Sequence, residues 1–173
     1  DTPLKGLYHL LKAMAVVDGA RRLHLVVIGR PKKGGGIEKL IARLGIGDRV
    51  TFTGRIDHKE YVRQYARAEM AVVPSVYEGF GLPAGEAMAC AVPVISTTGG
   101  ALPEVVGDAG LLVPPADPAA LARAVETLYD QPQLAAELGA AGRRRVLTQF
   151  TWERAAQRTE AVYREVIDDH RRF

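Results

Sequence analysis

The chain has 173 residues, 47% of them hydrophobic, which is enough to enclose one ordinary core and lies at the upper end of the single-domain range. Lys and Arg number 23 against 20 Asp and Glu, so the formal charge is only +3 and no basic stripe indicates a nucleic-acid partner. One cysteine excludes an internal disulfide and a cysteine-cluster zinc site, and no apolar run approaches the ~18 residues of a membrane span. We therefore expect a cytoplasmic protein.

Short apolar runs alternate with helical segments along the chain. The runs rich in Val, Ile and Leu predict strands at 23–29, 50–54, 70–75, 92–97 and 110–114. Composition and spacing predict helices over 4–17, 37–44, 59–67, 84–90, 118–129, 133–147 and 152–167. This alternation is typical of an α/β fold with a Rossmann-like parallel sheet flanked by helices. Because the pattern opens on a helix, we expect a fragment whose first strand is absent.

Several side chains outside the glycine-rich region have simple structural interpretations. Asp117 followed by Pro118 is a standard helix start. Cys90 is expected to pack as a small hydrophobic residue, and Trp152 is expected to anchor the last helix by packing. The run Arg143–Arg145 predicts a solvated helix face, with a peripheral contact to an anionic membrane surface as the alternative. The four histidines show no metal-ligand spacing.

The stretch SVYEGFGLPAGEAMA, residues 75–89, follows a predicted strand and should lie at the carboxyl edge of the sheet, where open α/β folds bind ligands. Gly79 and Gly81 would let backbone amides approach a ligand, and Pro83 suits the start of a helix that carries Glu86. Free N–H groups and the helix dipole at such a start favour an anion. A phosphate group is the anion that we expect.

Two carboxylates, Glu78 and Glu86, would repel a phosphate held at the same place. The conflict disappears if they face hydroxyl-rich ends of the ligand, because each ionised carboxylate can accept from both hydroxyls of a vicinal diol. A ribose and a hexose would supply such hydroxyls, so the ligand implied is a nucleotide-sugar. The alternatives are a surface turn whose carboxylates only stabilise a helix start, and a glycosidase pair, which requires a carboxylate separation that sequence does not give.

Further motifs accompany this stretch in a fixed order: KGL at 5–7, VTFTG at 50–54, EGFGLP at 78–83, EAMA at 86–89, VPVI at 92–95, GG at 99–100, LPEVVG at 102–107, GLLVPP at 110–115 and FTWE at 150–153. Together they resemble the carboxyl-terminal half of glycosyltransferase family 4 over nearly the whole chain. The resemblance implies one half of a GT-B fold, in which two Rossmann-like domains face each other across a cleft. Residues 1–173 would be the donor-binding domain, without the amino-terminal acceptor domain.

The resemblance also implies roles for three charged residues. Glu78 would contact hydroxyls of the transferred sugar, and Glu86 would bind the ribose diol. Lys5 would neutralise the diphosphate as it leaves, which is electrostatic stabilisation of developing charge. The family's arginine lies five residues before this lysine and would fall just outside the chain. These assignments make Glu78 and Lys5 the candidate catalytic residues, with no metal and no other cofactor.

The remaining matched residues would contact the donor largely through backbone atoms: Gly79, Phe80, Gly81 and Leu82 at the sugar or distal phosphate, Gly29 at the nucleotide, and Arg55 and Ile56 at the base. The sequence departs from the family at Gly85, where a larger apolar residue is usual, and at Ala91, where glycine is usual. The loop after Gly29 lacks a second glycine, and the segment Gly34–Gly36 is interpreted as a flexible loop.

The resemblance implies a retaining enzyme that transfers a hexose-type sugar from a nucleotide diphosphate sugar to an acceptor hydroxyl. Its terminal region would pack toward the acceptor domain, and the isolated domain would bind donor but transfer poorly. The alternative is a non-catalytic nucleotide-sugar-binding or interaction module. A dinucleotide-binding oxidoreductase is disfavoured because no GxGxxG fingerprint is present. The base, whether UDP, GDP or ADP, stays open.

Overall fold

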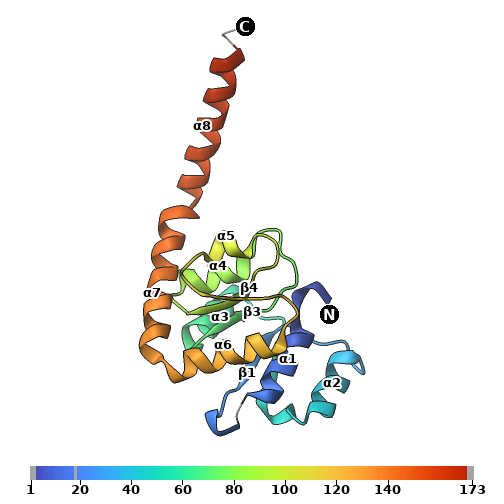
Figure 1. Cartoon of the computed structure of the whole chain (residues 1–173). Coiled ribbons are helices and arrows are strands. Elements are labelled where there is room, and N and C mark those ends of the chain that lie inside the picture. Colours follow the sequence, from blue (N-terminus) through green and yellow to red (C-terminus); the bar gives the residue numbers. More distant parts are fainter. Residues whose placement is uncertain (1–2, 18, 171–173) are drawn as a thin grey trace.

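The computed structural model describes residues 3–17 and 19–170, in which parallel strands are flanked by helices (Figure 1). The strands are β1 (Leu25–Ile28), β2 (Val50–Gly54), β3 (Ala71–Val73), β4 (Val94–Thr97) and β5 (Leu111–Val113). β1 pairs with β2, and β3, β4 and β5 form a second sheet in that order, with every pairing parallel. The expected α/β fold is confirmed.

The helices are α1 (Leu7–Val16), α2 (Gly36–Leu44), α3 (His58–Arg67), α4 (Leu82–Ala89), α5 (Leu102–Val106), α6 (Pro118–Asp130), α7 (Pro132–Gln149) and α8 (Trp152–His170). Short 3-10 turns η1 (Pro3–Lys5), η2 (Gly19–Arg21) and η3 (Gly47–Arg49) complete the described elements. The helix predicted over 4–17 is in fact divided, because Gly6 adopts a left-handed conformation with φ of 70° between η1 and α1. α5 was not predicted.

The central strand of the three-stranded sheet is buried on both faces, since all four residues of β4 are buried. On one face, Ile95 packs in a cluster that includes Leu121 of α6. On the other face, Val94 packs in a cluster that includes Met88 of α4 and Val106 of α5. Burial on both faces explains why this strand reads as a continuous apolar run instead of an alternating one.

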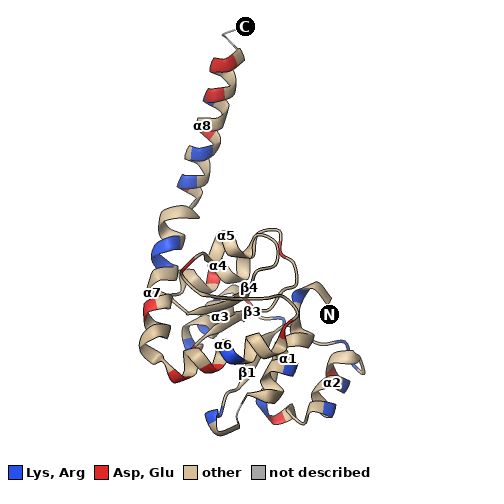
Figure 2. Ribbon diagram, viewed as in Figure 1, with Lys and Arg blue, Asp and Glu red and all other residues tan. Residues whose placement is uncertain are grey.

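α8 extends away from the rest of the fold (Figure 1), and each of its residues is exposed. Trp152 is 87% exposed, so the expectation that it anchors the helix by packing is wrong. The helix carries both basic and acidic residues (Figure 2). Its large exposed apolar side chains, hereafter the α8 stripe, are Trp152, Val162, Tyr163, Val166 and Ile167. No helix in the described part of the chain is long and apolar enough to cross a membrane.

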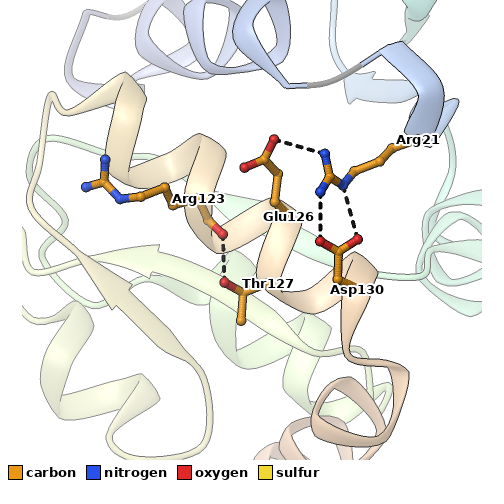
Figure 3. A network of polar contacts seen from close by, with 5 residues as sticks. All are labelled: Arg21, Arg123, Glu126, Thr127 and Asp130. Atoms are coloured by element: carbon orange, nitrogen blue, oxygen red, sulfur yellow. Dashed lines mark hydrogen bonds and ion pairs between the residues drawn. The ribbon is translucent and has the colours of Figure 1, made fainter.

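A polar network joins η2 to α6 (Figure 3). Arg21 donates from Nε to Asp130 Oδ1 at 3.1 Å, from Nη2 to Asp130 Oδ2 at 2.7 Å, and from Nη1 to Glu126 Oε1 at 3.2 Å. The planar guanidinium donates two hydrogen bonds to one carboxylate, which adds geometric specificity to the attraction between the charges. These hydrogen bonds from Arg21 hold the pKa of Asp130 below its ordinary value. On the same helix, the Thr127 hydroxyl donates to the carbonyl of Arg123 at 2.8 Å.

The arginine run on α7 also contacts the body of the fold: Arg143 and Arg144 are exposed, as expected of a solvated face, whereas Arg145 is only partly exposed. Arg143 donates to the carbonyl of Ala89, the last residue of α4, at 2.7 Å. Arg145 donates to the carbonyls of Glu104 and Val105 in α5 at 2.7 and 2.8 Å. Carbonyls in the last turn of a helix have no intrahelical partner, so these guanidinium groups satisfy them. The membrane contact considered for this run stays a prediction.

Candidate functional site

Three segments meet beyond the carboxyl ends of β3 and β4, at the edge where the sequence placed the ligand. The amide of Val76, in the loop after β3, donates to the carbonyl of Leu4 in η1 at 2.8 Å. The amide of Ala101, in the loop after β4, donates to the carbonyl of Glu78 at 2.9 Å. The loop that carries Glu78 is therefore held between η1 and the segment before α5.

Two glycines allow this close approach. A Cβ on Gly6 would lie 1.8 Å from the carbonyl oxygen of Pro74, and a Cβ on Gly100 would lie 2.2 Å from that of Glu78. Both residues also have positive φ, at 70° and 65°, a conformation that residues other than glycine rarely adopt. Sequence reasoning gave Gly100 no role of its own and missed that of Gly6. The GG motif was the available signal for Gly100.

The two candidate catalytic residues form an ion pair. Lys5 Nζ donates to Glu78 Oε1 at 2.6 Å, and the hydroxyl of Ser75 donates to the same oxygen at 2.9 Å. The Glu78 side chain is 12% exposed, whereas that of Lys5 is 58% exposed. The carboxylate is thus fixed by the loop, and the lysine reaches it from the solvent side. Lys5 can move to another anion without disturbing the core.

The loop between Glu78 and α4 presents backbone donors. Within residues 3–17 and 19–170, no acceptor takes a hydrogen bond from the amides of Gly79, Phe80, Gly81 and Leu82. Gly81 has φ of 93° and forms the N-cap of α4, so these amides precede a helix N-terminus. The ring of Phe80 packs edge-on against Phe150, with centroids 5.8 Å apart, and holds the loop in place. Amides at such a position favour an anion.

Glu86 lies in α4, a helix that two tyrosines join to α3. The hydroxyl of Tyr61 donates to Glu86 Oε2 at 2.6 Å and lies 3.3 Å from the hydroxyl of Tyr65. Tyr65 in turn donates to the carbonyl of Pro83 at 3.2 Å. Burial, followed by the hydrogen bond to Glu86, raises the pKa of Tyr61, so its hydroxyl stays a donor. Sequence reasoning missed Tyr61, because a tyrosine in a helix carries no signal for a partner 25 positions away.

Gly29, Arg55 and Ile56, which the sequence assigned to the nucleotide and the base, lie together at one cavity of about 450 Å³. Its lining residues are Ile28, Gly29, Arg30, Gly54, Arg55, Ile56 and Tyr61. Because Tyr61 also contacts Glu86, the expected base-side residues and the expected ribose-side carboxylate are connected through one side chain. Neither this cavity nor the larger cavity described next is lined by Gly79, Phe80, Gly81 or Leu82.

A larger cavity of about 820 Å³ lies between the two sheets. Residues 21–31, which include β1, and residues 67–75, which include β3, line it together with Lys5 and Glu78. β1 and β3 are each the terminal strand of their sheet, so both face this cavity with an edge that pairs with no strand among the described residues. The cavity therefore runs from these edges to the Lys5–Glu78 pair.

No group of three or more His, Cys, Asp or Glu side chains in the described part of the chain could hold a metal ion. Cys90 is a free thiol that packs partly buried against the cluster around α4, as its expected role as a small hydrophobic residue requires.

Residues 2–145 match the family described as Glycosyl transferases group 1. The chain belongs to this family. This group 1 glycosyltransferase chain is 44% identical over 170 residues to an MMP alpha-(1->4)-mannosyltransferase of Mycolicibacterium hassiacum, a match that covers 96% of this chain and 41% of that protein. It is 38% identical over 183 residues to a D-inositol 3-phosphate glycosyltransferase of Streptomyces scabiei, covering 99% and 41% of the two chains.

Solved structures of this kind have the same fold. Sucrose-phosphate synthase from Thermosynechococcus elongatus superimposes with a TM-score of 0.82 at 38% identity, covering 97% of this chain and 44% of that one. The group 1 chain thus spans about two fifths of the length of the relatives that it matches. The family and the names of these relatives support glycosyl transfer.

Proposed function

We propose that residues 1–173 are the donor-binding domain of a retaining glycosyltransferase that transfers a hexose-type sugar from a nucleotide diphosphate sugar to an acceptor hydroxyl. The observation that carries this proposal is the Lys5–Glu78 ion pair beside the amides of residues 79–82. One cation, one shielded carboxylate and a helix N-terminus lie together at the carboxyl edge of a parallel sheet, where such folds bind ligands. Membership in the group 1 family supports a nucleotide-sugar as that ligand.

The proposed mechanism divides the donor between these groups. Lys5 and the amides before α4 stabilise the negative charge that grows on the diphosphate as the glycosidic bond breaks, so the site needs no metal ion for this step. Glu78 accepts hydrogen bonds from hydroxyls of the sugar, and Glu86 accepts from the ribose diol. Lys5 must leave Glu78 when the donor enters. Its 58% exposure and its position outside the core permit that exchange.

We propose that an acceptor-binding domain completes the enzyme. Two surfaces support this part of the proposal: the facing edges of β1 and β3, which a parallel strand would join into one sheet, and the exposed α8 stripe. The relatives, of which this chain spans about 41%, are long enough to contain both a further strand and a further domain. We place the enzyme in the cytoplasm, with peripheral membrane contact, also as proposals.

Calorimetric titration of the chain with UDP, GDP and ADP, and then with their sugar conjugates, tests the proposal. We expect one nucleotide to bind. Glu86→Ala should lower its affinity about 10-fold or more, because a hydrogen bond to a charged group contributes about 1.5 to 3 kcal/mol. Glu78→Ala should remove only the additional affinity that the sugar provides. Glu137→Ala, an exposed carboxylate on α7, is the matched control and should bind as the wild type does.

Absence of nucleotide binding at millimolar concentration, or equal binding by the wild type and Glu86→Ala, would contradict the donor-site assignment. A second measurement separates the enzyme from a non-catalytic binding module. Sugar transfer by the complete protein should fall by orders of magnitude with Glu78→Ala. A non-catalytic binding module would transfer no sugar, whether position 78 is glutamate or alanine.

A further inference from the structure

Tyr61 lies between the two parts of the proposed donor site. Its hydroxyl donates to Glu86 Oε2 at 2.6 Å, and the residue also lines the cavity that contains Gly29, Arg55 and Ile56. In the described part of the chain, no other residue at that cavity has a hydrogen bond to Glu86. The contact thus links helix α3 to helix α4 at the place where ribose and base would meet.

The contact solves a problem of orientation for Glu86. This glutamate is exposed on a helix surface, where a free side chain samples several rotamers and must lose that freedom when it binds a ligand. A hydrogen bond that is already formed removes part of the loss before the ligand arrives. An ionised carboxylate has about four lone-pair sites, so one bond to Tyr61 leaves enough acceptors for both hydroxyls of a diol.

The tyrosine is itself held firmly. Its ring meets that of Tyr65 edge-on, with centroids 5.2 Å apart and planes at 89°. Tyr65 is tied to the backbone of α4 through the carbonyl of Pro83. The raised pKa of Tyr61 keeps its hydroxyl protonated through the physiological range, so it donates constantly to the carboxylate. Glu86 is thus held by an oriented donor on a neighbouring helix.

We propose that Tyr61 is a positioning residue that orients Glu86 for recognition of the ribose diol, and so makes this site selective for ribonucleotides over deoxyribonucleotides. The inference rests on the proposed function, because it assigns the Tyr61 contact to the ribose of the donor. It goes further in naming a residue and a selectivity that the proposed donor site does not by itself require.

Titration of the wild-type chain and Tyr61→Phe with UDP, GDP, ADP and their 2′-deoxy forms tests the inference. The phenyl ring keeps the cavity wall and the contact with Tyr65, so a change reports the hydroxyl alone. We expect Tyr61→Phe to lower the affinity for the ribonucleotide about 3- to 10-fold, the range for one hydrogen bond. The affinity for its 2′-deoxy form should change much less. In a Glu86→Gln background, Tyr61→Phe should have little further effect, because the two residues act through one contact.

Tyr163→Phe is the matched control. It removes the hydroxyl of an exposed tyrosine on α8 that lines neither cavity, and should bind ribonucleotide as the wild type does. The inference is overturned if Tyr61→Phe binds the ribonucleotide as tightly as the wild type or more tightly, or if the ribo and deoxy forms lose the same affinity. In either case, nucleotide binding by the wild type leaves the proposed function intact. Failure of the wild type to bind any nucleotide overturns both.

Discussion

Gly6 lies directly after Lys5, and its left-handed φ of 70° turns the chain from η1 into α1. A Cβ at this position would lie 1.8 Å from the Pro74 carbonyl oxygen, which belongs to the backbone at the start of the site loop. We expect Gly6→Ala to lower the free energy of unfolding by about 2 to 4 kcal/mol, the sum of a strained φ and a backbone clash. Urea unfolding of the variant measures this loss.

Gly19→Ala provides the control for that measurement. Gly19 has no atom within 4 Å of an added Cβ, and its φ is an ordinary one, so alanine should leave the unfolding midpoint unchanged or raise it slightly. Equal losses for the two variants would contradict the role of Gly6. Lys5 should also become easier to modify with an amine reagent in Gly6→Ala, because η1 no longer lies against the Glu78 loop.

At the residue scale, the sequence predicted what a motif carries and missed what only the fold brings together. Lys5 and Glu78 were both chosen by resemblance, and the fold places them in contact, although 73 positions separate them. Tyr61 was missed because its partner lies on another helix. The departure at Ala91 has a visible physical meaning: this alanine has φ of 58°, a conformation that glycine adopts without strain.

At the element scale, prediction succeeded where composition alone decides. The predicted bounds of β2, residues 50–54, are the observed ones. The five-residue helix α5 is too short to show a helical period, so sequence reasoning could not find it. The left-handed break at Gly6 likewise leaves no periodic signal. The contacts of Arg143 and Arg145 depend on which helix ends lie beside α7, which is a property of packing.

Asp130, at the end of α6, links this helix to η2 through Arg21. The hydrogen bonds from Arg21 hold its pKa below the ordinary value of 3.8. A carboxyl group whose pKa is lower in the native state than in the unfolded chain stabilises the native state. This stabilisation is fully present above the pKa of the unfolded state and is lost as the pH falls through the pKa of the native state. We therefore expect Asp130→Asn to unfold at lower urea than the wild type at pH 7, and the difference to shrink below about pH 3.8. Urea midpoints measured across the acid range test this expectation.

The Arg21→Gln background tests whether Arg21 is the cause. There, Asp130→Asn should change the midpoint little at any pH, since the charged donor is gone and the two changes are not additive. A difference between wild type and Asp130→Asn that stays constant from pH 7 to pH 2.5 would show that the carboxylate contributes nothing through its ionised form, and would contradict the assignment.

At the scale of the whole molecule, the described chain has a well-buried body and two surfaces that its own residues leave open. The body is the three-stranded sheet with α1, α4, α5 and α6 against its faces. The open surfaces are the facing edges of β1 and β3 and the α8 stripe. The α8 stripe belongs to none of the three buried clusters, so its loss should leave the body folded, whereas Val73 of β3 lies within one of them. Sequence periodicity found α8 as a helix, but could not tell that its apolar side faces solvent.

A chain that ends at Thr151 tests this division. None of the α8 residues is buried, so we expect the urea midpoint of the shortened chain to match that of the full chain, within about 0.5 kcal/mol in free energy of unfolding. Leu121→Ala, in the buried face of α6, sets the scale, since loss of a buried leucine side chain costs about 2 to 5 kcal/mol. If the shortened chain loses as much stability as Leu121→Ala, α8 packs on the body in solution. If it loses none but associates less with itself at high concentration, the α8 stripe is an apolar surface that drives association.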